Sequence, residues 1–218
     1  MDAVNVYRKG NKVLKIYNDD DASDPRGDSN ICKMVCFHRN YNLGDKHNYK
    51  QSDYNSWEEL KKAIIKAEKV VTIAPLYLYD HSGLYIKVGS FQGTLPQGHA
   101  EFDTMCVGFI YVTLDTLTEE FDIKRRGKKA TEKAEYWINV EMKTYSAYVE
   151  GSVYGFKLLE VDEKGEEVEE LDSCWGFYGY DIEENGILDN AGITKEEWKE
   201  WKEIQEVKTT STSYRYEE

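Results

Sequence analysis

The sequence predicts an α+β protein: a mostly antiparallel sheet with three to four helices packed on one side or at its ends. Helical patterns are few and lie scattered among strand patterns, unlike the regular alternation of a doubly wound parallel sheet. Hydrophobic residues make up 40% and aromatic residues 13% of the 218 residues, which suffices for a folded core. Because no repeat or linker divides the chain, we expect one domain over residues 1–207, followed by a frayed tail at 208–218.

The first elements are predicted to be strands. Residues 3–17 alternate in hydrophobicity around Lys9-Gly10-Asn11, which is typical of a hairpin. A polar loop follows over residues 18–30. The short apolar run at 31–37 then predicts a buried strand.

The clearest helix begins after Ser56. Ser56 and Glu59 have the spacing of a capping box. The apolar residues that follow form one stripe, composed of Leu60, Ala63, Ile64 and Ala67.

Residues 70–79 predict a strand that Pro75 interrupts. A turn at Asp80-His81-Ser82-Gly83 and a returning strand at 84–88 follow. Residues 107–112 predict another buried strand.

Two helices and a strand pair are expected next. A short helix is predicted at 114–121 and a long one at about 131–150, ending at Gly151. Strands are predicted near 152–162 and 167–178. A last helix is expected from the capping box of Thr194 and Glu197, with one face composed of Trp198, Trp201 and Ile204.

The net charge is concentrated at the C-terminal end of the chain. Residues 160–218 hold 19 of the 41 acidic and 6 of the 28 basic residues, which leaves 22 of each in residues 1–159. An acidic surface attracts basic partners and repels nucleic acid. We therefore expect a basic partner, with no direct nucleic-acid contact and no membrane contact.

Candidate partner-binding residues combine this acidic quarter, 160–207, with the aromatic segment at 172–181. Glycines allow close backbone approach, and aromatic rings supply contact area. A strand crossing under a helix would explain the same segment. The candidates are Glu166, Glu167, Glu169, Glu170, Trp175, Tyr178, Tyr180, Asp181, Glu183, Glu184, Glu196, Glu200 and Glu203.

An alternative hypothesis is a small hydrolase that acts on a nucleotide or nucleic-acid signal. His81 or His99 would be its general acid or base, oriented by Asp80 or Asp103. The competing interpretation of residues 80–83 is a turn stabilised by Asp and Ser side chains.

No cofactor or metal is expected. Cys32, Cys36 and His38 resemble the start of a zinc site, but a second ligand pair is missing, so buried strand thiols are favoured. Phosphate-loop and nucleophile-elbow motifs are absent, and the basic patch at 124–129 has no interleaved aromatics. Four cysteines and an N-terminus without an apolar core predict a reducing cytoplasm.

Four segments resemble a family of largely uncharacterised accessory proteins of bacteriophages and mobile elements. They are HRNYNLGD at 38–45, LYLYDHSG at 76–83, VGFIYV at 107–112 and DSCWGFYGYD at 172–181. The resemblance implies a phage or mobile-element protein in a bacterial cell, and it implies no particular chemistry. Together with the charge, it favours an anti-defence protein, an inhibitor of the anti-CRISPR or anti-restriction type. Its partner would be a basic host protein or nuclease complex in the cytoplasm of the bacterial host cell. Homo-oligomer formation through the aromatic segment stays open as a third hypothesis.

Overall fold

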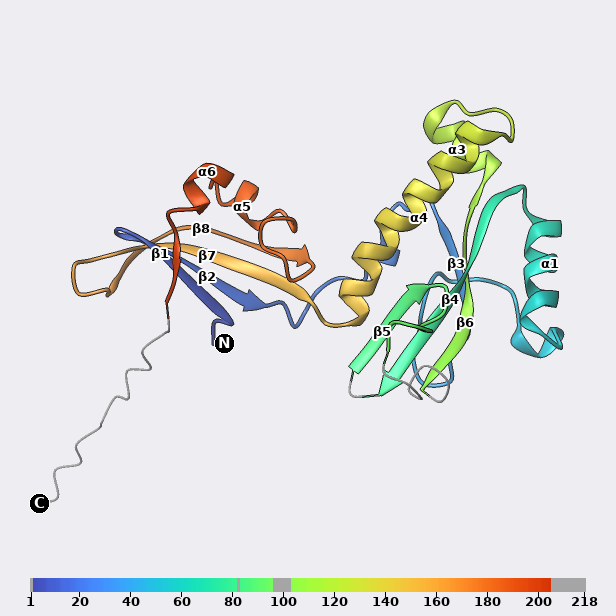
Figure 1. Ribbon diagram of the computed structural model, residues 1–218, viewed down its shortest axis with the longest axis horizontal. Helices are drawn as coiled ribbons and strands as arrows, with labels where there is room; N and C mark the ends of the chain where they lie inside the picture. Colours follow the sequence, from blue (N-terminus) through green and yellow to red (C-terminus); the bar gives the residue numbers. More distant parts are fainter. Residues whose placement is uncertain (1, 82, 96–102, 205–218) are drawn as a thin grey trace, which may run out of the picture. The chain divides into compact units, whose positions relative to one another are not determined.

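The computed structural model describes residues 2–81, 83–95 and 103–204 (Figure 1). Where the sequence led us to expect one domain, the chain divides into two compact units. Unit 1 is composed of Met1–Asp21 and Val153–Glu218, and unit 2 is the stretch between them, Ala22–Ser152. Both units combine antiparallel strands with helices, so the α+β prediction is confirmed.

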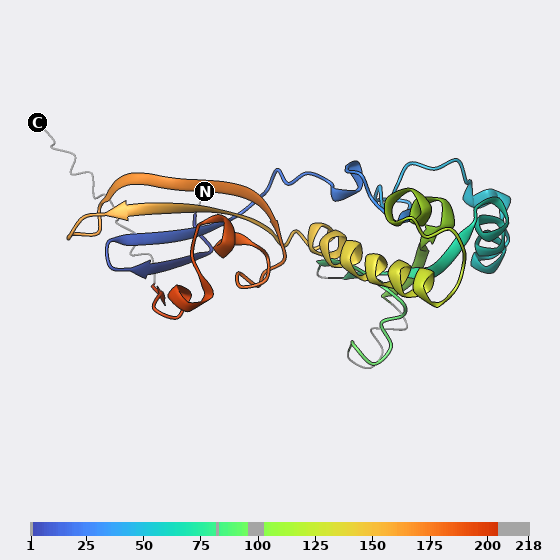
Figure 2. The same cartoon turned by 90° about the horizontal axis from the view of Figure 1, so that it is seen from above.

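Unit 1 contains a five-stranded antiparallel sheet in the order β8-β7-β2-β1-β9. In Figure 2, β1 and β2 (blue) lie beside β7 and β8 (orange). The predicted hairpin and the predicted C-terminal strand pair are confirmed. The strands are β1 (Asn5–Lys9), β2 (Lys12–Asn18), β7 (Val153–Val161), β8 (Glu167–Tyr178) and β9 (Lys202–Glu203).

The larger buried cluster of unit 1 lies on one face of this sheet, and a smaller one holds Val6, Val13, Leu159 and Val161. In the larger cluster, Leu14 and Phe156 are fully buried against the C-terminal segment, which supplies Ile187 and Leu188. These two residues belong to α5 (Ile187–Asn190), which is followed by α6 (Lys195–Trp198) on the same side of the sheet (Figure 1). Burial of these apolar side chains holds the C-terminal segment on the sheet.

The predicted last helix is corrected in its length. Its capping box is present, because the Thr194 hydroxyl accepts from the Glu197 amide and the Glu197 carboxylate accepts from Thr194. The helix nevertheless ends at Trp198, and Lys202–Glu203 pairs with β1 as a strand. Strand pairing with β1 therefore overrides the helical pattern of the sequence.

Unit 2 contains a four-stranded antiparallel sheet in the order β3-β6-β4-β5. Each of the four predicted buried or paired strands is present. They are β3 (Lys33–Cys36), β4 (Val70–His81), β5 (Gly83–Val88) and β6 (Thr104–Thr113).

The predicted interruption at Pro75 is wrong, because β4 continues through this residue. The carbonyl of Pro75 accepts a hydrogen bond from Gly89 N at 2.9 Å, so the proline nitrogen faces the same side of the strand. That side lies beyond the end of β5 at Val88. No ladder hydrogen bond is required of the proline there, which explains why the strand tolerates it.

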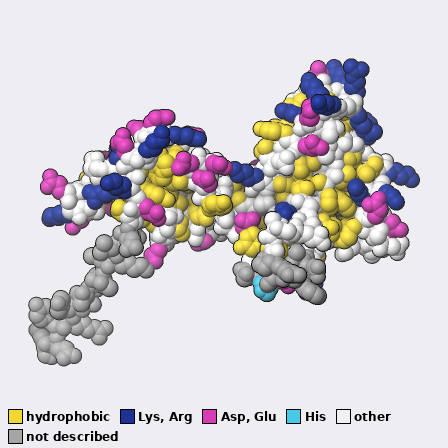
Figure 3. Space-filling view, viewed as in Figure 1, with side chains coloured by type: hydrophobic (Ala, Val, Ile, Leu, Met, Phe, Trp, Pro, Cys, Tyr) yellow, Lys and Arg dark blue, Asp and Glu magenta, His cyan; other side chains and the backbone are white. Residues whose placement is uncertain are grey.

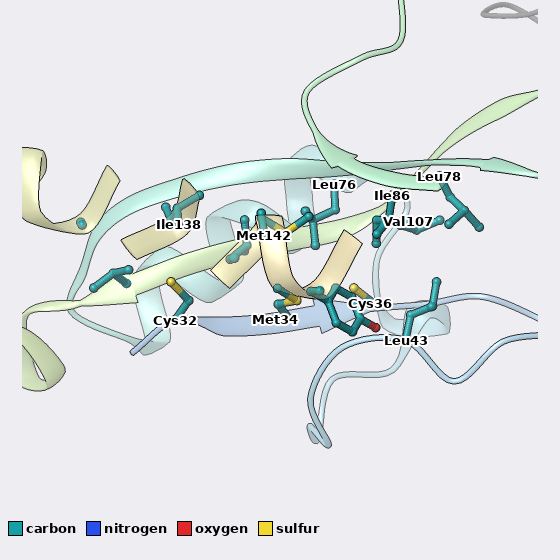
Figure 4. Packing of buried hydrophobic residues seen from close by; sticks show 14 of the residues in the cluster. Cys32, Met34, Cys36, Leu43, Leu76, Leu78, Ile86, Val107, Ile138 and Met142 are labelled. Atoms are coloured by element: carbon teal, nitrogen blue, oxygen red, sulfur yellow. The ribbon is translucent and has the colours of Figure 1, made fainter. Parts of the chain in front are cut away.

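Helices cover both faces of the sheet in unit 2. On one face, Ile138 and Met142 of α4 (Lys128–Val149) pack against Leu76 and Ile86 (Figure 4). On the other face, α1 (Trp57–Ala67) buries Leu60 and Ile64 of its predicted apolar stripe, whereas Ala63 is half-buried and Ala67 is exposed. A shorter helix, α3 (Leu114–Phe121), follows β6 directly. The predicted helices are confirmed, and α4 begins three residues before its predicted start.

A buried ionic network, which the sequence did not reveal, anchors the polar loop after residue 21. The Arg26 side chain, 3% exposed, binds Asp45 through two nitrogens at 2.7 and 3.0 Å and Glu141 of α4 at 2.7 Å. Both carboxylates also accept backbone N–H groups, Asp45 from Met34 and Glu141 from Ile31. The network thereby connects the loop, β3 and α4.

Candidate functional site

Nearly all of the net charge belongs to unit 1. Its two segments hold 23 acidic and 11 basic residues, a balance of −12, which leaves 18 and 17 of the chain's 41 and 28 for unit 2, a balance of −1. In the view of Figure 3, acidic side chains are spread over unit 1, with basic and hydrophobic side chains between them. The two units are therefore electrostatically different.

Strand β8 is an edge strand of the sheet, and its first half carries the densest group of predicted carboxylates. Glu167 pairs with Lys15 at 3.0 Å, and Glu170 pairs with Lys157 at 2.8 Å. A hydrogen bond from Lys157 lowers the pKa of Glu170. Two of the predicted carboxylates thus neutralise lysines of the same sheet.

The other two predicted carboxylates of the β7–β8 hairpin belong to Glu166 and Glu169, and both residues are exposed. Glu166 precedes β8, where its amide donates to Asp162. Glu169 lies opposite Glu160 in the ladder. We call Glu166, Glu167, Glu169 and Glu170 together the β8 carboxylates.

The aromatic segment combines packing with exposure. Trp175 lies directly over Gly155 of β7, where an added Cβ would stand 2.0 Å from the indole ring. Its ring centroid is 5.9 Å from that of Tyr17. Trp175 is nonetheless 41% exposed, and Tyr180 is 84% exposed. Tyr178 is half-buried at the end of β8. The glycine that permits close approach is therefore Gly155, outside the predicted segment.

The remaining predicted carboxylates lie in the C-terminal segment of unit 1. Asp181 accepts from the Glu183 amide at 3.0 Å and shapes the turn that also contains Glu184. Glu200 pairs with Lys9 at 3.0 Å, and Glu203 in β9 accepts from Asn5 at 3.0 Å. Glu196 lies in α6, Glu200 in the turn after it and Glu203 in β9, so these carboxylates do not lie along one helix.

A groove of about 600 Å³ in unit 1 brings three of these residues together. Its aromatic members were not among the predicted site residues. Burial raises the pKa of the Tyr7 hydroxyl, and the charge of Glu203 raises it further. The lining residues are Tyr7, Glu183, Lys195, Glu196, Trp198, Lys199, Trp201 and Glu203, and we call the space the aromatic groove.

The alternative His/Asp site is partly assembled at one end of the sheet in unit 2. His81 Nδ1 lies 3.9 Å from Asp103 Oδ2, and the Asp80 amide donates to the Asp103 carbonyl at 3.3 Å. The negative charge of Asp80 raises the pKa of Tyr41. Asp80 and His81 belong to the end of β4 and Gly83 begins β5, so the predicted turn is wrong at these three positions, and Ser82 lies outside the described residues. His99 lies outside the described residues.

The cysteines of the suggested zinc motif are core residues. Cys32 and Cys36 are buried, and burial raises the pKa of the Cys36 thiol to about 12. Thiols of this kind stay protonated and unreactive near neutral pH. Among residues 2–81, 83–95 and 103–204, no group of three or more His, Cys, Asp or Glu side chains could hold a metal ion.

A second groove, of about 530 Å³, lies in unit 2 beside β3. Tyr49, Tyr54, Tyr111 and His47 contribute to its lining. The Tyr111 hydroxyl donates to Glu68 at 3.3 Å, and burial raises its pKa. No sequence motif pointed to this groove.

Comparison with known proteins identifies no relative: no family model, no curated protein and no solved structure matches this chain. Within the part of the chain that the structure describes, none of the helices combines the length and apolar character needed to cross a bilayer. Function is therefore inferred from the charge and geometry of the chain itself.

Proposed function

We propose that the protein binds a basic, nucleic-acid-binding surface of another protein through unit 1. The observation that supports this most is the row of β8 carboxylates on an exposed edge strand, in a unit whose net charge is −12. Surfaces that hold nucleic acid present lysine and arginine to phosphates, so an array of carboxylates competes for the same groups. The resemblance to phage and mobile-element proteins adds the setting, inhibition of a CRISPR or restriction nuclease in the bacterial cytoplasm.

The test is displacement of labelled DNA from purified CRISPR effectors and restriction nucleases. We expect the protein to displace DNA from at least one of them, with an affinity that falls steeply as salt rises. The double variant E166Q/E169Q removes two exposed carboxylates and should weaken displacement by about tenfold.

The matched control is E119Q/E120Q, which removes two exposed carboxylates from α3 of unit 2. It should leave displacement unchanged. Equal losses in both double variants, or no displacement from any nuclease, would contradict the proposal.

The hydrolase alternative is favoured by one observation, the 3.9 Å separation of His81 and Asp103. The same assays separate the two functions through H81A, since His81 is half-exposed and its removal should leave folding intact. Binding through unit 1 predicts that H81A displaces DNA normally. Nucleotide or nucleic-acid hydrolysis that H81A abolishes would instead favour the enzyme.

A further inference from the structure

Three aromatic rings from distant parts of the chain form one wall of the aromatic groove. The ring centroids of Tyr7 and Trp198 lie 4.7 Å apart, and the ring planes make an angle of 62°. The centroids of Trp198 and Trp201 lie 6.2 Å apart, with 31° between the ring planes. All three residues are half-buried, so part of each ring faces solvent. The electron-rich faces of such rings attract cations.

The rings are held in place by backbone contacts around them. Tyr7 lies in β1, opposite Glu203 of β9. Trp198 ends α6, which the capping box of Thr194 fixes, and the Trp201 amide donates to the Trp198 carbonyl at 3.0 Å. A ligand therefore meets preorganised rings, which reduces the entropy cost of binding.

Carboxylates accompany the rings. Glu183, Glu196 and Glu203 line the groove and are exposed. Glu203 is oriented by its hydrogen bond from Asn5. Lys195 and Lys199 also line the groove, which leaves a balance of −1 there within a unit of −12. This balance disfavours phosphate and other anions as ligands.

We propose that the aromatic groove receives an arginine side chain of the basic partner, an inference that rests on the proposed function and names the partner's contact group. A guanidinium is planar and stacks on indole and phenol rings while its edge donates to carboxylates. An ammonium is compact and more strongly hydrated, so lysine uses the rings less well. The groove would then act as the anchor point of an interface whose remaining contacts come from the β8 carboxylates.

The test uses a blocked peptide with two arginines separated by glycine, and its isostere in which citrulline replaces each arginine. Binding is followed by the indole N–H signals of the five tryptophans. We expect the arginine peptide to shift the signals of Trp198 and Trp201, assigned with W198F and W201F, and to bind about tenfold more tightly than the citrulline peptide.

Matched variants locate the site. E196Q/E203Q removes two exposed carboxylates of the aromatic groove and should weaken the arginine peptide several-fold. E119Q/E120Q removes the same charge from α3 of unit 2 and should leave peptide binding within about twofold of wild type, since exposed charges outside the groove are largely screened.

Three results would overturn the inference. They are equal binding of the arginine and citrulline peptides, equal binding of a lysine peptide, and signal shifts confined to other tryptophans. The arginine peptide could fail to bind although the protein displaces DNA from a nuclease and E166Q/E169Q weakens that displacement. The proposed function would then stand without this groove. If the peptide binds but no nuclease is displaced, the groove stands and the nuclease target is wrong.

Discussion

At the scale of single residues, Arg26 connects three segments of unit 2. Its guanidinium is buried and forms charge-assisted bonds to Asp45 and Glu141, and each carboxylate in turn accepts backbone amides. Burial alone would lower the pKa of Arg26, but the two carboxylates raise it overall. The group therefore stays charged at every accessible pH and serves to hold the loop, β3 and α4 together.

We expect R26A to destabilise the protein by about 3 kcal/mol, because removing one partner leaves two carboxylates without their cation. R126A removes an exposed arginine of the same unit and should change stability by less than about 0.5 kcal/mol. Urea unfolding followed by circular dichroism measures both. A loss below about 1 kcal/mol in R26A would show that the network contributes little.

At the scale of elements, the packing of Trp175 of β8 on β7 requires a glycine at position 155. Trp175 of β8 occupies the space over Gly155, where a Cβ would stand 2.0 Å from the ring. Any larger residue at 155 must displace the indole or the strand. The exposed aromatic side chain is thus fixed by the strand beside it.

The change G155A should therefore destabilise unit 1 by about 1–3 kcal/mol through overpacking. In the W175A background, the added change G155A should cost little further stability, since the indole ring that it would clash with is gone. G27A, where an added Cβ meets nothing within 4 Å, is the matched control. Thermal unfolding of the four variants gives the coupling, and additive losses would contradict the packing described.

Local patterns predicted most elements, and long-range pairing decided the rest. Ser56 caps α1 as expected, although the Glu59 carboxylate accepts its hydrogen bond from the Asn55 amide and not from the Ser56 amide. The last helix stops early because Glu203 pairs with Tyr7, a partner from the other end of the chain. No pattern within one segment contains such a pairing.

The same limit applies to the candidate site. A count of charges predicted the acidic residues of unit 1, and the capping box placed Trp198 and Trp201 near each other. The aromatic groove also needs Tyr7, which strand pairing brings to them. The division at 21/22 falls within the polar loop predicted over residues 18–30, but the division at 152/153 lies in the short turn between α4 and β7, where no linker composition marks it.

At the scale of the whole molecule, unit 2 is a continuous stretch placed between the two segments of unit 1. It has its own sheet, helices on both faces and the Arg26 network. Its net charge of −1 contrasts with −12 in unit 1. The negative net charge and the Arg26 network thus belong to different units.

A chain of residues 22–152 alone should fold cooperatively, because every strand of its sheet lies within that range. It should show a single thermal transition and dispersed amide signals, and it should displace no DNA from a nuclease that the full chain inhibits. A molten or unfolded product would show that unit 2 depends on unit 1.

The same chain order sets the sequence of events during synthesis on a ribosome. Strands β1 and β2 emerge first, yet their partners β7 and β9 emerge only after all of unit 2. A two-stranded hairpin is only marginally stable in water. β1 and β2 therefore have no sheet partners while unit 2 folds. Unit 1 closes only after β7, β8 and β9 have been synthesised, and a product truncated before β7 would therefore contain a folded unit 2 together with an unpaired, exposed hairpin.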